Sequence, residues 1–380
     1  MKLLDRYVLR NFLEPLLLCF GGFLGLWLIY DFSANSGDLF KGGASLKQIG
    51  VFYLYQLPQI LMISLPAGIL LALLFCCYKM SRSNEIISIL TAGRSLPRIL
   101  LPLFGVGVLA SLLCLGLNYE WAPRADAAKK ALLEELKDPA HTKRYGQLKG
   151  HLFRDRTTDR TWFIRKMTID SPILEGLLVL QQDKSGIIQR KWYANRAIHD
   201  PVTGRWTLQR GMIIDVSPEG EVLKVDNFEE QGQRVIEGWT ESPRRIVAAN
   251  LDPQQLTVPE LQETIELNPD LPEAQLAQYK TILGDRWAFP WGCLVVVFIA
   301  APLGIVYSRR GSLSGTGLAF LFFFLMMIGR NLCLALGKGG RIAPELAAWL
   351  PQASFMSLGL ILLWFKAGNR SLSTLFGSKR

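Results

Sequence analysis

Six long apolar blocks constrain the fold of this chain more than any other feature. The hydrocarbon core of a bilayer is about 30 Å thick, and an α-helix needs roughly 20 apolar residues to cross it. Three blocks before residue 120 and three after residue 285 reach that length: Phe12–Phe32, Phe52–Lys79, Pro97–Tyr119, Trp287–Tyr307, Thr316–Gly337 and Ile342–Phe365. The sequence therefore predicts six transmembrane helices. The first block is too long for the apolar region of a typical signal peptide, so we interpret it as a retained helix.

Residues 120–285 contain no such block and predict one soluble domain between the third and fourth transmembrane helices. This stretch holds 23 Lys and Arg against 26 Asp and Glu, whereas the rest of the chain holds 19 basic and 6 acidic residues. The net charge of +10 therefore belongs to the membrane part, and it is not the basic footprint of a nucleic-acid-binding domain. We expect three regions: residues 1–119, 120–285 and 286–380, the last with a cytoplasmic tail.

The basic residues also predict an orientation. One set of chain ends and short loops carries thirteen of them: Lys2, Arg6, Arg10, Lys79, Arg82, Arg94, Arg98, Arg309, Arg310, Lys366, Arg370, Lys379 and Arg380. The opposite short loops carry Lys41, Lys47, Lys338 and Arg341. By the positive-inside rule, both termini are expected in the cytoplasm and the soluble domain outside, which in a bacterium is the periplasm.

Short runs rich in Ile, Val, Trp and Tyr, separated by turn residues, predict strands in the soluble domain. The runs are Thr161–Met167, Ile173–Gln181, Ile187–Ile198, Trp206–Val216, Glu221–Phe228 and Arg234–Thr240. Their spacing favours an antiparallel β sandwich or jelly roll over about residues 143–250. Inner and outer faces do not alternate cleanly, so the pattern does not assign strands to sheets. Flanking helices are expected over Glu120–Leu136, Thr257–Glu266 and Glu273–Leu283.

The loop between the second and third transmembrane helices predicts a short amphipathic helix over about residues 83–93. Ser83 can cap its first turn, where Glu85 is favoured by the helix dipole, and Gly93 is a typical stop. Ile86, Ile89 and Leu90 share one face, and Asn84, Ser88 and Thr91 share the other. The residues alone leave two interpretations: a connector that rests on lipid headgroups, or a docking element for a cytoplasmic partner.

Residues suited to catalysis or metal binding are not grouped in this sequence. The segment Gly337–Gly340 lacks the upstream glycine and the Ser or Thr of a phosphate-binding P-loop. All six cysteines lie in the apolar blocks without metal-ligand spacing, apart from the adjacent Cys76 and Cys77, which we interpret as packing residues. We therefore expect no catalytic residue, no metal and no cofactor in this chain.

A few charged residues lie within or beside the apolar blocks. Arg330 stands about seven residues inside the outer end of the fifth transmembrane helix. An intramembrane arginine is costly and usually faces a cavity or a partner, which suggests an anion-binding group on a substrate path. The alternative is an arginine that snorkels to the interface. Asp31 and Lys41 are interpreted as interfacial residues at the outer end of the first helix.

Several segments, taken in order, resemble the LptF/LptG (YjgP/YjgQ) family of lipopolysaccharide export permeases. They are Leu4–Tyr7, Leu57-Pro58 with Leu65-Pro66, Met80–Gly93, Glu120–Pro123, Arg286 with Pro290, Ala301–Gly304 and Ala347–Pro351. The resemblance extends over nearly the whole chain and includes the position of the inserted domain. The segment Leu4–Tyr7 resembles LptG slightly more than LptF.

This resemblance implies a permease subunit in the bacterial inner membrane that pairs with a paralogous permease and a dimeric cytoplasmic ATPase, which binds ATP and Mg. Lipopolysaccharide would enter beside the first and fifth helices, reach a periplasmic jelly roll, and pass to a bridge protein of similar fold. The docking segment would contribute Asn84, Glu85, Ile86, Ile89, Leu90 and Gly93. From charge and depth, we further expect that lipid phosphates are held near the outer mouth by Lys41, Arg286, Arg330 and Lys338.

Two rival functions fit the same residues. One is a permease of the same ABC (ATP-binding-cassette) architecture that exports another lipid or glycolipid. The other is a non-transporting scaffold that anchors periplasmic bridge proteins, in which Glu85 and its helix would be dispensable.

Overall fold

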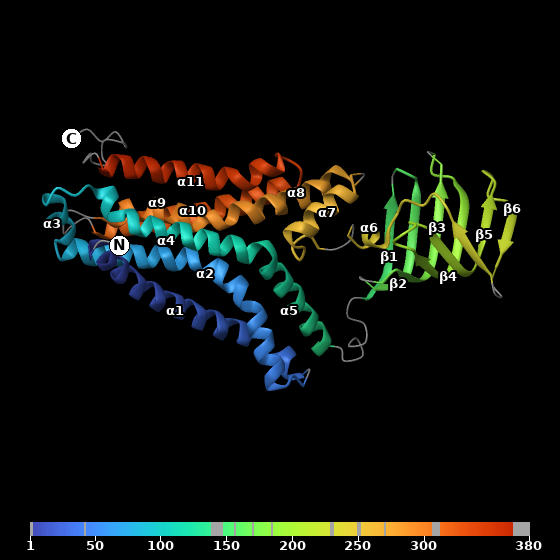
Figure 1. Ribbon diagram of the computed structural model, residues 1–380, viewed down its shortest axis with the longest axis horizontal. Helices are drawn as coiled ribbons and strands as arrows, with labels where there is room; N and C mark the ends of the chain where they lie inside the picture. Colours follow the sequence, from blue (N-terminus) through green and yellow to red (C-terminus); the bar gives the residue numbers. More distant parts are fainter. Residues whose placement is uncertain are drawn as a thin grey trace. The chain divides into compact units, whose positions relative to one another are not determined.

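The chain forms two compact units in a computed structural model (Figure 1). The structure describes residues 3–41, 43–137, 147–155, 157–168, 171–183, 185–228, 232–248, 252–269, 271–305 and 312–367. One unit, here the membrane unit, comprises Met1–Lys137, Pro253–Leu261 and Ala277–Arg380. The other, the β unit, comprises Asp138–Asp252 and Gln262–Leu276.

Six spans in the described part of the chain are long and apolar enough to cross a membrane, as predicted. Two of them continue through a short break into a second helix. The helices are α1 (Leu3–Lys41), α2 (Leu46–Arg82), α4 (Leu96–Gly116) with α5 (Ala122–Lys137), α8 (Glu273–Ala288) with α9 (Gly292–Gly304), α10 (Ser312–Lys338) and α11 (Pro344–Ala367). The predicted helices over 120–136, 257–266 and 273–283 are confirmed as α5, α7 (Val258–Leu267) and α8. A short α6 (Pro243–Ala248) was not predicted.

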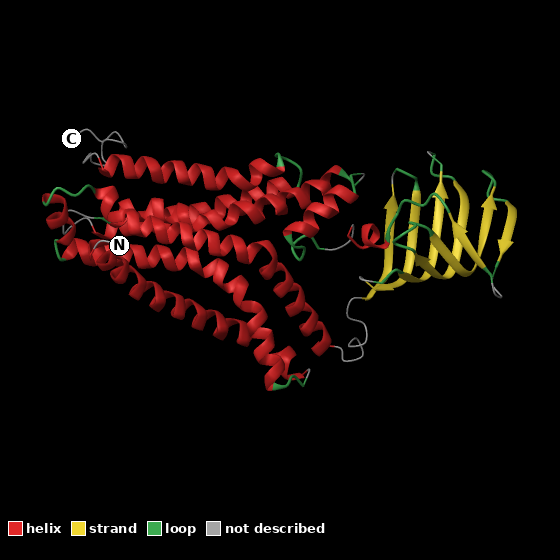
Figure 2. Ribbon diagram, viewed as in Figure 1, coloured by secondary structure: helices red, strands yellow, loops and turns green. Residues whose placement is uncertain are grey.

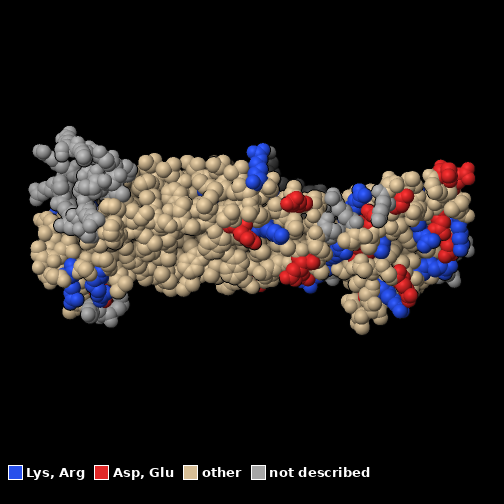
Figure 3. All heavy atoms as spheres, turned by 90° about the horizontal axis from the view of Figure 1, so that it is seen from above, with Lys and Arg blue, Asp and Glu red and all other residues tan. Residues whose placement is uncertain are grey.

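Helix α9 lies at the centre of the membrane unit and packs against α2, α4, α10 and α11. Small residues on its neighbours allow this close approach. A Cβ atom on Gly107 of α4 would come within 2.9 Å of Val297, and one on Gly359 of α11 within 2.7 Å of Phe298. On the face seen in Figure 3, charged side chains are nearly absent from a broad part of the helical surface between the unit's ends, as expected for contact with hydrocarbon.

The β unit contains one seven-stranded antiparallel sheet (Figure 2). Its strands are β1 (Gln147–Asp155), β2 (Arg160–Thr168), β3 (Ile173–Gln182), β4 (Ile188–His199), β5 (Trp206–Val216), β6 (Val222–Asn227) and β7 (Gln233–Ile236). The predicted antiparallel β domain is confirmed, and β1 is an addition to the predicted strands. Strands β1 to β6 pair in chain order, and β7 returns to pair with β5. This order is that of a meander, whereas a jelly roll typically combines two Greek keys.

A row of backbone irregularities crosses the sheet from β1 to β5. The row consists of residues that face one another between regular ladder pairs: Gly150, Arg165, Gly176, Asn195 and Arg210. Gly150, Gly176 and Arg210 have φ angles of +62°, +67° and +51°. Neighbouring strands keep the same register on both sides of this row, so each of them carries the irregularity at the same level of the sheet. We call these residues the bulge row, and the alternation of side chains changes phase where a strand crosses it.

The buried side chains follow that shift. In β2 the buried residues Ile164 and Met167 are three positions apart, and in β3 Leu174 and Leu177 are also three apart. A regular strand would bury every second residue. The bulge row therefore keeps the apolar side chains on one face of the sheet although their sequence spacing changes.

Four tryptophans form the centre of that apolar face. The ring centroid of Trp239 lies 4.7 Å from that of Trp162, 5.4 Å from that of Trp192 and 6.3 Å from that of Trp206. Trp239 belongs to the segment after β7, so this segment closes over the sheet rather than extending it. Edge-to-face aromatic pairs of this kind add about 0.5–1.5 kcal/mol each to the burial of their surface.

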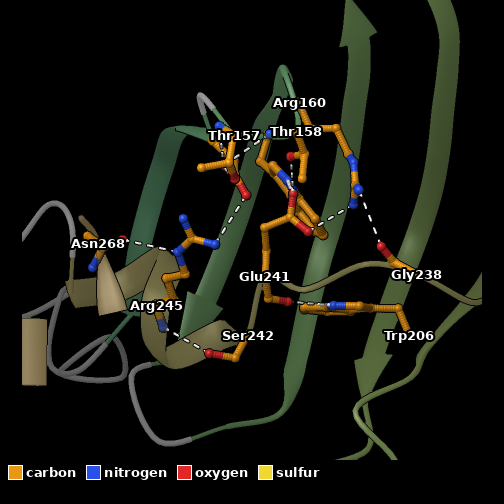
Figure 4. A network of polar contacts seen from close by, with 11 residues as sticks. Thr157, Thr158, Arg160, Trp206, Gly238, Glu241, Ser242, Arg245 and Asn268 are labelled. Carbon is orange, nitrogen blue, oxygen red and sulfur yellow. Dashed lines mark hydrogen bonds and ion pairs between the residues drawn. The ribbon is translucent and has the colours of Figure 1, made fainter. Parts of the chain in front are cut away.

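A buried carboxylate holds the same segment in place (Figure 4). Glu241 is fully buried and accepts hydrogen bonds from Arg160 Nη1 at 2.9 Å and Thr158 Oγ1 at 3.1 Å. The indole Nε1 of Trp162 donates to the same carboxylate at 3.3 Å. The indole of Trp206 donates to the backbone carbonyl of Glu241 at 2.7 Å. A buried charge that is paired and hydrogen-bonded in this way is tolerated, and it fixes the path of the chain.

A second buried pair joins β1 to α6. Arg245 Nη1 donates to the buried Asp155 at 3.1 Å, and Arg245 Nε donates to Asn268 at 3.3 Å (Figure 4). Burial raises the pKa of Asp155, but the hydrogen bonds from Thr157 and the charge of Arg245 outweigh it, so that this pKa lies below its ordinary value. The carboxylate therefore stays ionised and keeps its arginine partner.

Candidate functional site

Two transmembrane spans of the membrane unit are irregular where Asn118 and Arg286 meet. Between α4 and α5 the chain makes a π turn at Leu117–Trp121, and between α8 and α9 it makes a 3-10 turn at Phe289–Trp291. Asn118 of the π turn donates to the carbonyl of Arg286 at 2.8 Å, and Arg286 Nη1 donates back to Asn118 Oδ1 at 2.9 Å. Because π turns widen a helix and occur often at functional sites, this part of the unit is a candidate site.

A cavity of about 430 Å³ lies beside these two breaks. Its walls come from α2, the π turn and α5, α8, and α10, together with Gln254. The volume falls within the range of small-ligand pockets. Five of its lining residues carry a charge: Asp126, Asp285, Arg286, Arg330 and Lys338.

Arg330 lines this cavity and is paired inside the membrane unit, as expected for the first of its two interpretations. Its Nε donates to Asp285 Oδ1 at 3.0 Å and its Nη2 to Asp285 Oδ2 at 2.6 Å. The guanidinium carbon lies 4.3 Å from the centroid of the Phe289 ring. The two charged side chains are 18% and 21% exposed. Arg330 is thus held in one plane by a bidentate ion pair and an aromatic face.

Arg286 is bound differently, by uncharged acceptors. Besides Asn118 it donates from Nη2 to the backbone carbonyl of Gln254 at 2.6 Å. Within the described part of the chain its buried Nε has no hydrogen-bond partner. Lys338 lines the same cavity, and Asp126 forms an ion pair with Lys130 at 3.0 Å. Cationic groups therefore outnumber carboxylates in the lining, and part of the donor capacity of Arg286 is unused.

Three of the four basic residues proposed from the sequence are brought together in this cavity: Arg286, Arg330 and Lys338. The side chain of the fourth, Lys41, lies outside the described residues. Sequence reasoning missed Asp285 and Asn118. Asp285 directly precedes Arg286, but nothing in the sequence signals that α8 packs its carboxylate against a residue of α10. Among the described residues, no three His, Cys, Asp or Glu side chains are placed to hold a metal ion.

The loop between α2 and α4 contains the predicted helix, α3 (Glu85–Thr91), which is shorter than expected. The prediction that Ser83 caps it is wrong, because the Ser83 hydroxyl donates instead to the carbonyl of Lys79 at the end of α2, at 2.6 Å. Asn84 occupies the N-cap position in a left-handed conformation, with φ of 59°. Gly93 has φ of +79° and donates to the carbonyl of Leu90, which confirms the predicted stop.

The two faces of α3 divide as the sequence predicts. Ile86 is buried, and Ile89 and Leu90 pack against the core of the membrane unit. The exposed residues of segment 83–93 are Ser83, Asn84, Ile87, Ser88, Thr91, Ala92 and Gly93. The apolar members of the predicted docking set therefore anchor α3 to its own unit, and the surface open to a partner is largely polar.

The start of α1 is joined to this loop. The Tyr7 hydroxyl donates to Glu85 at 3.0 Å, and Asp5 forms an ion pair with Arg98, near the start of α4, at 3.0 Å. Both contacts join segments that are far apart in the sequence. They give a structural reason for the Leu4–Tyr7 motif, because two of its four side chains connect α1 to α3 and α4.

Six spans and an inserted antiparallel β domain are those of a multi-pass membrane protein, and its helical unit contains a charged cavity. Compared with known families, the chain matches the model described as lipopolysaccharide export system permease LptF/LptG over residues 6–365. The chain belongs to this family. The match is to both paralogues jointly, so it does not distinguish LptG from LptF. No individual curated protein matches the chain.

Proposed function

We propose that this chain is the permease subunit of an ABC transporter that extracts lipopolysaccharide from the outer leaflet of the inner membrane and delivers it to a periplasmic bridge. The observation that carries the proposal is the 430 Å³ cavity of a LptF/LptG family chain, where Arg286, Arg330 and Lys338 converge. Phosphate groups of a lipid are natural ligands for such a lining.

The proposed orientation places both termini in the cytoplasm and the β unit in the periplasm. The thirteen basic residues support it through the positive-inside rule. The contacts of Tyr7 with Glu85 and of Asp5 with Arg98 agree with it, because the orientation requires the start of the chain and α3 to lie at the same membrane face. On this orientation the cavity opens in the outer half of the membrane.

Energy for extraction would come from a separate ATPase. Each CH₂ group that leaves the bilayer costs about 0.8 kcal/mol, so a lipid with several acyl chains does not leave on polar contacts alone. A dimeric partner that binds ATP and Mg would dock on the exposed face of α3, around Glu85. A paralogous permease would supply the second half of the path. Movement of α3 would reach α1 through Tyr7 and the neighbouring helices through its buried Ile86.

After the cavity of the membrane unit, the lipid is proposed to bind the β unit. This unit contains a cavity of about 790 Å³ that is lined by apolar residues and by charged ones. Trp192, Leu223 and Trp239 are among the apolar residues, and Arg190, Asp215 and Lys224 among the charged ones. A lining of both kinds suits a lipid with acyl chains and phosphates, and a bridge protein with a jelly-roll fold would receive that lipid. The rivals are export of another lipid or glycolipid, and a scaffold without transport.

The test is purification of the tagged protein from native membranes in mild detergent, with mass spectrometry of bound proteins and lipids. Glu85→Arg is compared with wild type and with Glu175→Arg, a control at an exposed position of β3 in the β unit. We expect an ATPase and a second permease with wild type and with the control, and loss of the ATPase from Glu85→Arg. Lipopolysaccharide in the sample identifies the cargo, and a different lipid favours the first rival. Absence of an ATPase from wild type, under conditions that preserve other ABC complexes, refutes the proposal in favour of the scaffold.

A further inference from the structure

We infer that the Asp285 carboxylate binds the Arg330 guanidinium in the place that a lipid phosphate takes when a lipid enters the cavity. The phosphate then replaces the carboxylate. The inference rests on the proposed function and assigns Asp285 a role in setting affinity. It concerns a carboxylate that neither the sequence motifs nor the family match marks out.

The geometry of the pair is that of an arginine engaged with a planar or tetrahedral oxyanion. Both Asp285 oxygens are used, and they accept from Nε and Nη2, the edge of the guanidinium that also binds phosphate in a bidentate manner. Phe289 stacks against Arg330 and holds the plane of the fork when its partner changes. An incoming phosphate therefore competes for the same two N–H groups.

The pair is accessible enough for such an exchange. Both side chains retain about a fifth of their exposure and line the cavity. A fully buried ion pair would be expensive to open, because each ion would lose its partner without gaining solvent. Here a phosphate that enters the cavity can replace Asp285 while Asp285 turns to the cavity water.

Arg286, the residue after Asp285, is where the incoming phosphate binds first. The hydrogen bonds that Arg286 donates go to uncharged acceptors, and its Nε has no hydrogen-bond partner among the described residues. Asp285 and Asp126 act on its charge without a hydrogen bond to it. Arg286 can attract an anion before the Arg330 pair opens. Since Asp285 and Arg286 are adjacent on α8, the same turn of helix carries the group that attracts the phosphate and the group that competes with it.

Competition of this kind suits a transporter that must release what it binds. A site is useful for transport when binding is favourable enough for entry and weak enough for exit. Asp285 lowers the affinity of the loaded state, because a displaced carboxylate beside a bound phosphate is repelled by it. Removal of the carboxylate should therefore tighten binding rather than weaken it, which a purely structural ion pair would not do.

The experiment measures lipid binding to the full-length protein in phosphatidylcholine nanodiscs. The probes are diphosphorylated lipid A, the same lipid without phosphates, and inorganic phosphate. Asp285→Asn is compared with Asp285→Glu, which keeps the competing charge, and with Glu345→Gln, which removes an exposed carboxylate from the first turn of α11, outside the cavity lining. We expect Asp285→Asn to bind diphosphorylated lipid A about tenfold more tightly than wild type. Affinity for the dephosphorylated lipid should not change.

The controls decide the interpretation. Both Asp285→Glu and Glu345→Gln should stay within about twofold of wild type, and Arg330→Gln combined with Asp285→Asn should lose the gain. An equal gain for inorganic phosphate would overturn the assignment to a lipid headgroup. If a folded Asp285→Asn variant binds lipid A as wild type does or more weakly, the inference is overturned. Binding of lipid A by wild type leaves the proposed function intact in that case. If wild type binds no lipid A at all, it is the proposed function that fails.

Discussion

Glu241→Gln tests whether the buried carboxylate of the β unit stabilises the segment that closes over the tryptophans. Glutamine has nearly the same shape and its oxygen can still accept from Thr158 and Trp162. Arg160, which is 11% exposed, would keep only the carbonyl of Gly238 and lose its charged partner. Breaking a buried ion pair from one side costs about 3–5 kcal/mol, and the retained hydrogen bonds reduce this to roughly 2–4 kcal/mol.

The measurement is hydrogen exchange of the β2 and β3 amides in the full-length protein in detergent. A loss of roughly 2–4 kcal/mol should lower their protection by about thirtyfold to a thousandfold. The matched control is Glu175→Gln, because Glu175 pairs with Lys166 across the same two strands but is 51% exposed. We expect its effect to stay below about 1 kcal/mol.

Equal effects of the two substitutions would refute this reasoning, since they would show that burial of the charge does not matter. An effect of Glu241→Gln below about 0.5 kcal/mol would refute it as well, because that is the range of ordinary surface substitutions. Protection changes confined to the membrane unit would indicate that the substitution acts elsewhere.

Three further predictions concern single residues. Arg210→Gly should raise the stability of the β unit by up to about 1 kcal/mol in the same exchange assay, because glycine adopts the positive φ without strain; no gain relative to Arg210→Ala would contradict this. Tyr7→Phe should leave ATPase binding intact but lower the lipid transported per ATP hydrolysed, since the bond to Glu85 is lost; unchanged coupling would show that α1 does not receive the movement. Burial lowers the pKa of His199 below its ordinary 6.5, although the charge of Asp200 acts in the opposite direction. His199 therefore takes up its proton at a higher pH in the unfolded chain than in the folded chain, and the stability of the β unit should fall as the pH drops through 6.5. A pH series on wild type and His199→Gln checks this, and equal slopes would be inconsistent with it.

The spans and most strands could be predicted because their signals are local. Long apolar runs identify helices by composition alone, and glycines with positive φ end the strands where the turns were expected, as at Gly186, Gly204 and Gly220. Strand β1 was missed because its sequence is mostly polar and contains Gly150. The bulge row was not predictable for a related reason, since a single extra residue changes the buried spacing from two to three and destroys the alternation that reveals a strand.

Only basic residues of the candidate site could be predicted from the sequence, and their partners could not. Arg330 is conspicuous because an arginine within an apolar helix is rare, but its partner is 45 residues away on another helix. Such a pairing depends on how α8 packs against α10, which no local pattern records. Ser83 shows the same limit at short range, because two helix ends compete for its hydroxyl and the end of α2 takes it.

The π turn at Leu117–Trp121 makes the length of this segment a determinant of the site. A π turn takes one more residue per turn than an α turn, so loss of one residue from it would restore a regular helix with little rotation of α5. Asp126 would then stay in the cavity, but the widened turn that carries Asn118 to Arg286 would be gone. Single-residue insertions and deletions in this turn are therefore a route by which related chains could gain or lose the contact with Arg286 while they keep every charged side chain of the lining, and an alignment that places the gap elsewhere would put α5 out of phase.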